Sequence, residues 1–253
     1  MRLRTRIVAV LLVAAAVAGG ACRSGRIKED PILRLSAAES LAEGKRLMAI
    51  EKYEQARKYL VHAFEVEPNS AGGREALLLA ADALFLQGGS QNLIQAEAKY
   101  RDFQNRFPTS DRAAYVQFQI GKSVAARMER PDRDQAISVK ALQAFEDLVR
   151  LYPGSEYAEA ARAEVRRVRE SLAEHEFVVG VFYLRYGLPL AAVSRFERLL
   201  TEYDDYTGRD KVIYHLGLAY EKAKRSEDSQ AAFTRLRSEH PDSPYAAQAP
   251  DKG

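Results

Sequence analysis

Apolar residues recur at spacings of three and four from Ala37 onward, and no stretch alternates apolar and polar positions over the length of a strand. This spacing places apolar side chains on one face of an α-helix. A longer period overlies the helical one. Three segments share the same offsets: Gly44, Leu47, Tyr53, Ala56, Leu60, Ala63 and Pro68; then Gly180, Tyr183, Gly187, Ala192, Phe196, Leu199 and Asp204; then Gly217, Tyr220, Ser229, Phe233, Leu236 and Pro241.

Two further segments keep only the second half of this pattern, because longer loops displace their first halves. They are Ala96, Tyr100, Phe103 and Pro108, and Ala141, Phe145, Leu148 and Pro153. The pattern is that of tetratricopeptide repeats. Small residues let paired helices approach closely, the aromatic or Leu fills the groove between them, and Pro ends the second helix.

The sequence therefore predicts an all-α solenoid of about five helix-turn-helix repeats over residues 37–245, with 246–253 as a C-terminal tail. Each repeat would stack on its neighbours and leave a concave face lined by the first helices. An unrelated all-α bundle is the alternative.

The N-terminus carries an export pattern. Residues 1–6 hold three arginines and no acid, residues 7–18 are apolar, and small residues then precede Cys22. A positive flank, a short apolar run and small residues are typical of a bacterial signal peptide. The apolar run is too short to cross a bilayer comfortably, because a span needs about 20 residues.

This segment resembles a lipoprotein signal, in which the residue after the cleavage site is a lipidated Cys. We expect residues 1–21 to be the signal and Cys22 to be lipidated. Residues 22–36 would then form a flexible tether. Arg23 after the Cys favours the outer membrane by the sorting rule of such lipoproteins. An ordinary secretory signal with a chance Cys is the alternative.

Charge and composition restrict the function classes. The chain has 38 basic and 35 acidic residues, and without the three arginines of the signal the two are equal, so charge does not indicate nucleic-acid binding. A single Cys excludes an internal disulfide framework and Cys-rich zinc sites. The four histidines stand singly, and no HExxH, CxxC, phosphate-loop or GxSxG motif occurs. We expect no catalytic residue, no metal and no cofactor. The cluster Glu174-His175-Glu176 is expected to form a solvated or partner-facing surface.

Residues 131–200 are more specific than a generic repeat. They contain DRD at 132–134, AxxxFxxLVRLYPGSEYAxxA at 141–161 and RxSLAEHEFVVGVFYLRYGLPLAAVSRFERLL at 169–200. These motifs, in this order behind a lipoprotein N-terminus, resemble the BamD family of outer-membrane assembly lipoproteins. The resemblance covers the mature chain. Tyr186, Pro189 and Asp204 depart from the family pattern, which affects the turns of the fourth repeat.

The resemblance implies a non-enzymatic scaffold of the machine that folds β-barrels into the outer membrane, lipid-anchored at its periplasmic face. Its implied partners are the periplasmic domains of the barrel-forming subunit, accessory lipoproteins and unfolded β-barrel substrates. Docking of the barrel subunit is implied for Arg195, and less directly for Arg185 and the DRD residues Asp132, Arg133 and Asp134. Alternatively, Arg195 pairs with Glu197 or a neighbouring helix, and the DRD loop is satisfied internally.

The inward positions of the first helices suggest a groove for an extended peptide. They are Leu41, Lys45, Met48, Leu78, Asp82, Phe85, Phe118 and Lys122. Apolar pockets beside ammonium groups suit a peptide that ends in an aromatic residue and a free carboxylate, as the last strand of a β-barrel does. Alternatively, Leu78, Phe85 and Phe118 are core residues between helices.

A second function class is a periplasmic repeat lipoprotein that coordinates cell-wall synthesis or envelope constriction. Such proteins often carry an N-terminal coiled coil, which needs sustained heptads. Residues 23–36 are too short to hold one.

Overall fold

The computed structural model describes residues 30–250, so the predicted signal peptide and Cys22 lie outside the described residues. Contacts divide the chain into two compact units, Met1–Leu35 and Ser36–Gly253. The described part of the first unit contains one short 3-10 helix, η1 (Pro31–Arg34), whose cap Asp30 accepts a 3.0 Å hydrogen bond from the Ile32 N–H.

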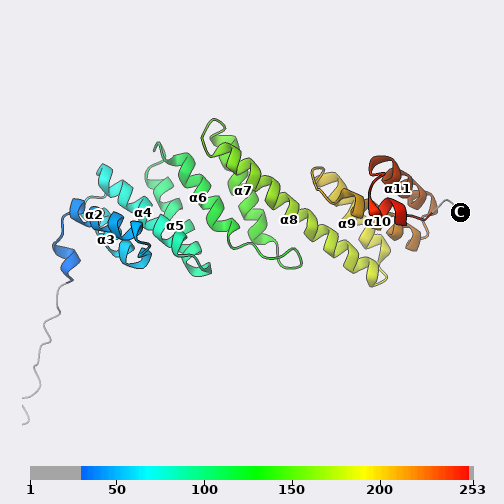
Figure 1. Ribbon diagram of the computed structural model, residues 1–253, viewed down its shortest axis with the longest axis horizontal. Coiled ribbons are helices and arrows are strands. Elements are labelled where there is room, and N and C mark those ends of the chain that lie inside the picture. Colours follow the sequence, from blue (N-terminus) through cyan, green and yellow to red (C-terminus); the bar gives the residue numbers. More distant parts are fainter. Residues whose placement is uncertain (1–29, 251–253) are drawn as a thin grey trace, which may run out of the picture. The chain divides into compact units, whose positions relative to one another are not determined.

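The second unit is a succession of helices in which each packs against the next (Figure 1). No strand occurs among residues 30–250, so the prediction of an all-α solenoid is confirmed. Within residues 36–250, ten helices form five antiparallel pairs, and the short α12 follows them. The helices are α2 (Ala37–Ala49), α3 (Tyr53–Val66), α4 (Ala71–Gln87), α5 (Ser90–Arg106), α6 (Ala113–Ala125), α7 (Ala136–Leu151), α8 (Ala158–Arg185), α9 (Pro189–Glu202), α10 (Arg209–Lys222), α11 (Ser226–Glu239) and α12 (Pro244–Gln248).

The repeat positions recognised in the sequence form the core. In the second helix of every pair, the small residue and the large apolar residue four positions later are buried: Ala56 and Leu60, Ala96 and Tyr100, Ala141 and Phe145, Ala192 and Phe196, Ser229 and Phe233. Burial of the same two positions in five pairs confirms the predicted register of the second helices.

Glycines mark the closest crossing within four of the pairs. Gly44 faces Leu60, Gly121 faces Phe145, Gly180 faces Phe196 and Gly217 faces Phe233, and a Cβ at any of these glycines would lie within 3.0 Å of the facing side chain. The pattern predicted this small residue in three repeats, and Gly121 adds the third repeat to the set.

The turns inside three pairs share one backbone shape. Glu51, Gly187 and Lys224 all have positive φ, of 58°, 75° and 62°, and each stands seven residues after the crossing glycine of its repeat. The next N–H in each turn donates back to a carbonyl of the first helix, as Leu188 does to Tyr183 at 2.9 Å. Equivalent positions in these three repeats therefore share the same left-handed backbone conformation as well as the same spacing from the glycine.

Helix α8 is about twice as long as the other first helices. Its first half, through Val168 and Leu172, is buried with α6 and α7, whereas Ala173 and Leu184 are buried with α9 and α10. One continuous helix thus joins the core of the third pair to that of the fourth.

Helical packing continues past residue 245. The expected boundary between repeat domain and tail falls inside α12, and Ala246 and Ala249 are buried in the same core cluster as α10 and α11. The folded region therefore extends at least to Ala249.

Candidate functional site

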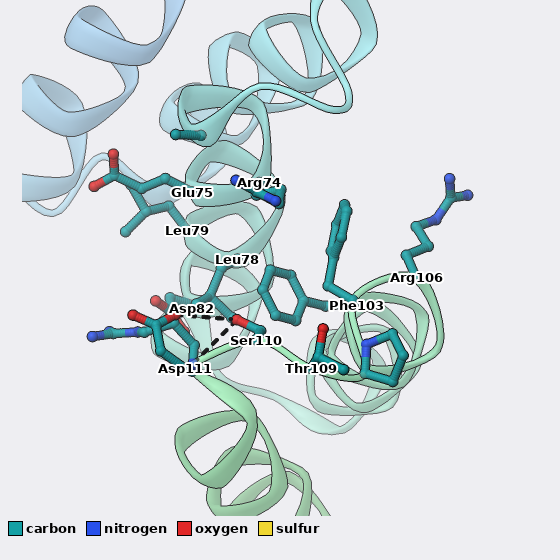
Figure 2. Close-up of a pocket in the computed structure, with 14 residues that line it drawn as sticks. Arg74, Glu75, Leu78, Leu79, Asp82, Phe103, Arg106, Thr109, Ser110 and Asp111 are labelled. Atoms are coloured by element: carbon teal, nitrogen blue, oxygen red, sulfur yellow. Dashed lines mark hydrogen bonds between the residues drawn. The ribbon is translucent and has the colours of Figure 1, made fainter.

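A pocket of about 680 Å³ opens between α4, the end of α5 and the loop that leads into α6. We call it the α4–α6 pocket (Figure 2). Its lining residues are Ala71, Arg74, Glu75, Leu78, Leu79, Asp82, Phe103, Arg106 and the loop residues 107–112. It combines an apolar floor with three arginines and three carboxylates, of which Asp82 is half-buried and Glu75 and Asp111 are exposed.

The floor consists of side chains that the repeat core holds in place. Leu78 and Phe103 are buried in the cluster shared by α4, α5 and α6, and the half-buried Phe107 packs against that cluster. The Phe103 and Phe107 rings meet edge to face with centroids 5.2 Å apart. Because both belong to the end of α5, the helix that the Pro108 turn terminates, the apolar floor is fixed by the fold.

The arginines stack on aromatic rings. The guanidinium carbon of Arg74 lies 5.8 Å from the Phe107 centroid, and that of Arg112 lies 5.0 Å from the Tyr115 centroid. Arg106 lies over Phe64 and pairs with Asp102 at 2.8 Å. Within residues 30–250, no carboxylate oxygen lies within salt-bridge distance of the guanidinium nitrogens of Arg74 or Arg112. Both side chains are exposed, so they offer planar donors to an incoming anion.

Asp82 also lines the pocket, one turn beyond Leu78 on α4 (Figure 2). Its Oδ1 accepts hydrogen bonds from the Tyr100 hydroxyl at 2.6 Å and the Tyr115 hydroxyl at 2.8 Å. Burial raises the pKa of the Asp82 carboxyl, against the opposing effects of the two hydroxyls and of Arg112. Burial and the neighbouring carboxylate also raise the pKa of Tyr100 and Tyr115, which keeps both as donors.

Of the eight inward positions predicted from the sequence, Leu78 and Asp82 line this pocket. The other apolar ones pack against the core: Leu41 and Met48 against the α2–α4 cluster, Phe85 half-buried beside α5, and Phe118 stacked on Tyr157 with centroids 5.5 Å apart. The two lysines form ion pairs, Lys45 with Glu75 at 2.8 Å and Lys122 with Glu164 at 3.0 Å. The two ammonium groups therefore already have carboxylate partners.

Sequence reasoning missed Arg74, Arg106 and Arg112. The repeat pattern includes Phe103 and Pro108 but assigns no role to the arginines near them. The signal was the segment 103–112, FQNRFPTSDR, in which two arginines flank the helix-ending Pro beside a second Phe.

Arg195, the first predicted docking residue, lies in an ion cluster between α8 and α9. Glu176 is 8% exposed; it accepts from Arg195 at 3.0 Å and also from Arg198. The bond to Glu176 raises the pKa of Arg195. Arg195 also lies 6.0 Å from the Tyr183 centroid. Its intramolecular partner is thus on the neighbouring helix rather than at Glu197.

The other predicted docking residues lie elsewhere. Arg185 is exposed in the last turn of α8. In the loop before α7, Asp132 pairs with Arg130 at 2.7 Å, and Asp134 accepts from the Ala136 N–H at 2.8 Å. The exposed Arg133 side chain has no ion-pair partner within residues 30–250. Two of the three DRD side chains thus serve the loop itself.

The Glu174-His175-Glu176 cluster is not the solvated surface expected from the sequence. Glu174 binds Tyr206 and Lys211, and Glu176 binds the two arginines of α9. The His175 Nδ1–H donates to the Pro131 carbonyl at 2.6 Å. The expectation was wrong because α8 passes between two core clusters, so three successive side chains reach three different neighbours.

No helix within residues 30–250 combines the length and apolar composition needed to cross a membrane. No group of three His, Cys, Asp or Glu side chains in that range is arranged to hold a metal ion.

Comparison with known proteins first gives the class. Residues 211–243 match the tetratricopeptide repeat family, in agreement with the helix pairs. Among solved structures, a yeast Sti1 tetratricopeptide domain has a TM-score of 0.43 and 14% identity over 83% of this chain and 80% of that one. The MamA protein has a TM-score of 0.36 and 15% identity over 81% of this chain and 92% of that one.

The family is more specific. Residues 35–225 match the family described as outer membrane lipoprotein. The outer membrane protein assembly factor BamD of Rickettsia prowazekii is 24% identical over 97% of this chain and 95% of its own length. BamD of Pasteurella multocida is 30% identical over 67% of this chain and 68% of its own. The chain belongs to this outer membrane lipoprotein family, the BamD family of outer membrane protein assembly factors.

Proposed function

We propose that the chain is a non-enzymatic scaffold of the β-barrel assembly machinery, anchored by a lipid on Cys22 to the periplasmic face of the outer membrane. It docks the barrel-forming subunit, works beside accessory lipoproteins, and receives the C-terminal strand of unfolded β-barrel substrates in the α4–α6 pocket. The observation that carries this proposal is that Arg74 and Arg112, which form no ion pair within residues 30–250, lie beside an apolar aromatic floor.

The pocket chemistry matches the end of such a strand. A guanidinium presents a rigid fork of donors that can hold a carboxylate in bidentate geometry. Arg74 and Arg112 are pre-positioned by stacking on Phe107 and Tyr115. The floor of Leu78, Phe103 and Phe107 offers a buried surface for one aromatic side chain, which is the kind of anchor that dominates peptide affinity.

The arginines suit this role better than the lysines expected from the sequence. Lys45 and Lys122 would have to leave Glu75 and Glu164 before binding a substrate carboxylate. Glu75, Asp82 and Asp111 also line the pocket, and their carboxylates repel a second negative charge. The peptide carboxylate is therefore proposed to bind directly at the guanidinium groups of Arg74 and Arg112.

The test is a titration of the mature chain with a labelled peptide that has the sequence of a β-barrel's last strand, with its carboxylate free or amidated. We expect amidation to weaken binding by about tenfold, because a lost charge-assisted hydrogen bond is worth about 1.5–3 kcal/mol. Arg74→Ala combined with Arg112→Ala should weaken the free-acid peptide similarly and leave the amidated peptide unaffected.

Arg133→Ala is the matched control, because it removes an exposed arginine of the α6–α7 loop, outside the pocket. Its binding curve should coincide with that of the wild type. Equal binding of both peptides by the wild type and by the double variant would remove the pocket from the proposal.

Docking is better tested at Arg185 than at Arg195. Arg195→Glu would place a second carboxylate against the buried Glu176 and disturb the α8–α9 packing itself. Arg185→Glu changes an exposed charge with no such partner. If the proposal holds, it should weaken capture of the barrel-forming subunit while leaving helicity unchanged.

A further inference from the structure

A second cavity, of about 340 Å³, opens between α7 and the first half of α8, two helices that pack against each other (Figure 1). We call it the α7–α8 pocket. It shares no residue with the α4–α6 pocket or with the predicted docking residues, and its lining residues are Glu146, Val149, Arg150, Arg162, Val165 and Arg166. Cavities of this size with an apolar interior and a few polar groups are typical of binding sites.

The floor of the α7–α8 pocket is apolar and is held in place by the core. On each helix the three lining residues have the spacing i, i+3, i+4, which places them on one helix face. The middle residue of each set is a valine. Val149 and Val165 are half-buried and pack against the core cluster that contains Phe145 and Leu148. The two valines are therefore fixed by the fold, and little conformational entropy would be lost when a partner covers them.

Three guanidinium groups border this floor. Arg150 pairs with Asp147 at 2.6 Å, and Arg162 pairs with Glu159, in each case across one turn of the same helix. Surface pairs of this kind contribute little to stability, so a partner's carboxylate can replace the one on the helix. Arg166 is exposed and forms no ion pair among the residues that the structure describes. The pocket thus offers one free guanidinium and two that can exchange partners.

The charges are distributed unevenly between the two helices. Helix α8 contributes Arg162 and Arg166 to the lining, whereas α7 contributes Arg150 together with the exposed Glu146. A bound carboxylate is therefore attracted to the α8 side and repelled from Glu146 on the α7 side. An anionic bilayer fits less well, because it requires a cluster of about four to eight basic residues and the pocket has three beside an acid.

We propose that the α7–α8 pocket docks an acidic segment of a partner protein, in which one large apolar side chain lies between Val149 and Val165 and a neighbouring Asp or Glu binds Arg162 and Arg166. The apolar side chain is the buried anchor, and the guanidinium forks hold the carboxylate in bidentate geometry. This site is independent of the proposed strand receptor. The chain can therefore hold such a partner and a substrate strand at the same time.

The experiment is a titration of the full mature chain with a short fluorescent peptide that has a central Leu flanked by Glu residues. Its C-terminus is amidated, so that it lacks the free carboxylate proposed to bind in the α4–α6 pocket. The test variant is Arg162→Ala with Arg166→Ala. The matched control is Arg74→Ala with Arg112→Ala, which removes the same charge from the other pocket. Circular dichroism verifies that both variants keep the wild-type helicity.

We expect the test variant to weaken binding roughly tenfold, the loss typical of a missing charge-assisted hydrogen bond, and the control to stay within about twofold of the wild type. A peptide with Ser in place of the central Leu should bind the wild type about tenfold more weakly, because the apolar anchor is missing. A peptide with Lys in place of each Glu should not bind.

Three results would overturn the proposal. Equal binding of the Leu and Ser peptides would mean that charge alone attracts the segment. A loss in the control instead of the test variant would place the peptide in the α4–α6 pocket. Absence of saturable peptide binding, with flotation on phosphatidylethanolamine–phosphatidylglycerol vesicles that depends on Arg162 and Arg166, would assign the pocket to lipid. None of these results bears on the binding of a free-acid strand peptide, so the proposed function is tested separately.

Discussion

At the residue scale, Asp82 is a half-buried carboxylate that accepts hydrogen bonds from two tyrosine hydroxyls. Its partial burial and its hydrogen bonds act in opposite directions on stability. The hydroxyls of Tyr100 and Tyr115 need an acceptor, because a buried donor left unpaired destabilises the fold. Burial of the charge is unfavourable in itself, which is why the pKa of Asp82 is raised. Geometry and charge at this position can therefore be separated by substitution.

We predict that Asp82→Ala lowers the free energy of unfolding by about 2–6 kcal/mol, since two hydroxyls lose their acceptor at roughly 1–3 kcal/mol each. Asp82→Asn keeps an acceptor oxygen without the charge and should be within about 1 kcal/mol of the wild type at pH 7. Chemical denaturation of the three proteins measures both differences. Equal losses in the two variants would mean that the charge, not the acceptor, matters.

The pH dependence follows from the direction of the pKa shift. Because the folded state has the higher pKa, it binds a proton more readily than the unfolded state as the pH falls toward the ordinary Asp value of 3.8. The wild type should therefore gain stability relative to Asp82→Asn between pH 7 and about pH 4. Denaturation midpoints of the two proteins across that range measure the gain, and parallel curves would contradict the raised pKa.

The crossing glycines give a second test at this scale. A Cβ at Gly180 would meet the Phe196 ring, which is fully buried and has no room to retreat. We predict that Gly180→Ala destabilises the protein by about 1–3 kcal/mol through overpacking. Gly154→Ala is the control, because a Cβ there meets nothing within 4 Å. Thermal or denaturant unfolding should separate the two, and equal stability would remove close crossing from the account.

At the element scale, the turns inside the helix pairs use one backbone shape with different residues. Gly187 adopts positive φ freely, whereas Glu51 and Lys224 adopt it against the steric preference of a side chain. The sequence pattern showed a glycine here in the fourth repeat alone. The shared shape could not be read from Glu51 or Lys224, because neither residue type signals a left-handed turn.

We predict that Lys224→Gly stabilises the protein by up to about 1 kcal/mol, since relief of left-handed strain exceeds the added chain entropy. Lys222→Gly, two residues earlier in the last turn of α10, should instead destabilise by up to about 1 kcal/mol. Opposite signs in unfolding measurements would support the turn assignment. A loss of stability in both variants would contradict it.

Element lengths were predicted less well than core positions. The offsets identified Ala192, Phe196 and Leu199 as buried, and the structure agrees. They did not identify α8 as a single 28-residue helix, because a repeat pattern of two short helices gives no reason to join residues 158–172 to the first helix of the next pair. In the structure, Val168 and Leu184 lie in different core clusters, and the single helix α8 connects the two clusters.

At the scale of the whole molecule, function depends on contacts between repeats, and these are harder to predict than contacts within them. The α4–α6 pocket takes residues from two pairs and from the loop between them. Its arginines have no fixed place in the repeat period. Lys45 and Lys122 were predicted to face the groove, but the carboxylates that neutralise them come from other helices and were not anticipated. A pattern defined within single repeats predicts neither the positions of these arginines nor the carboxylates that pair with the lysines.

Family membership covers residues 35–225 and gives the chain its place among outer membrane protein assembly factors. The central claim beyond it is that the chain physically joins the barrel-forming subunit. The most direct measurement is affinity capture of the full-length chain from detergent-solubilised outer membranes, with the co-captured proteins identified and quantified by mass spectrometry. The scaffold account predicts near-stoichiometric barrel-forming subunit with the wild type and clearly less with Arg185→Glu. Capture of a peptidoglycan-synthesis enzyme in its place, with no barrel-forming subunit, would contradict it.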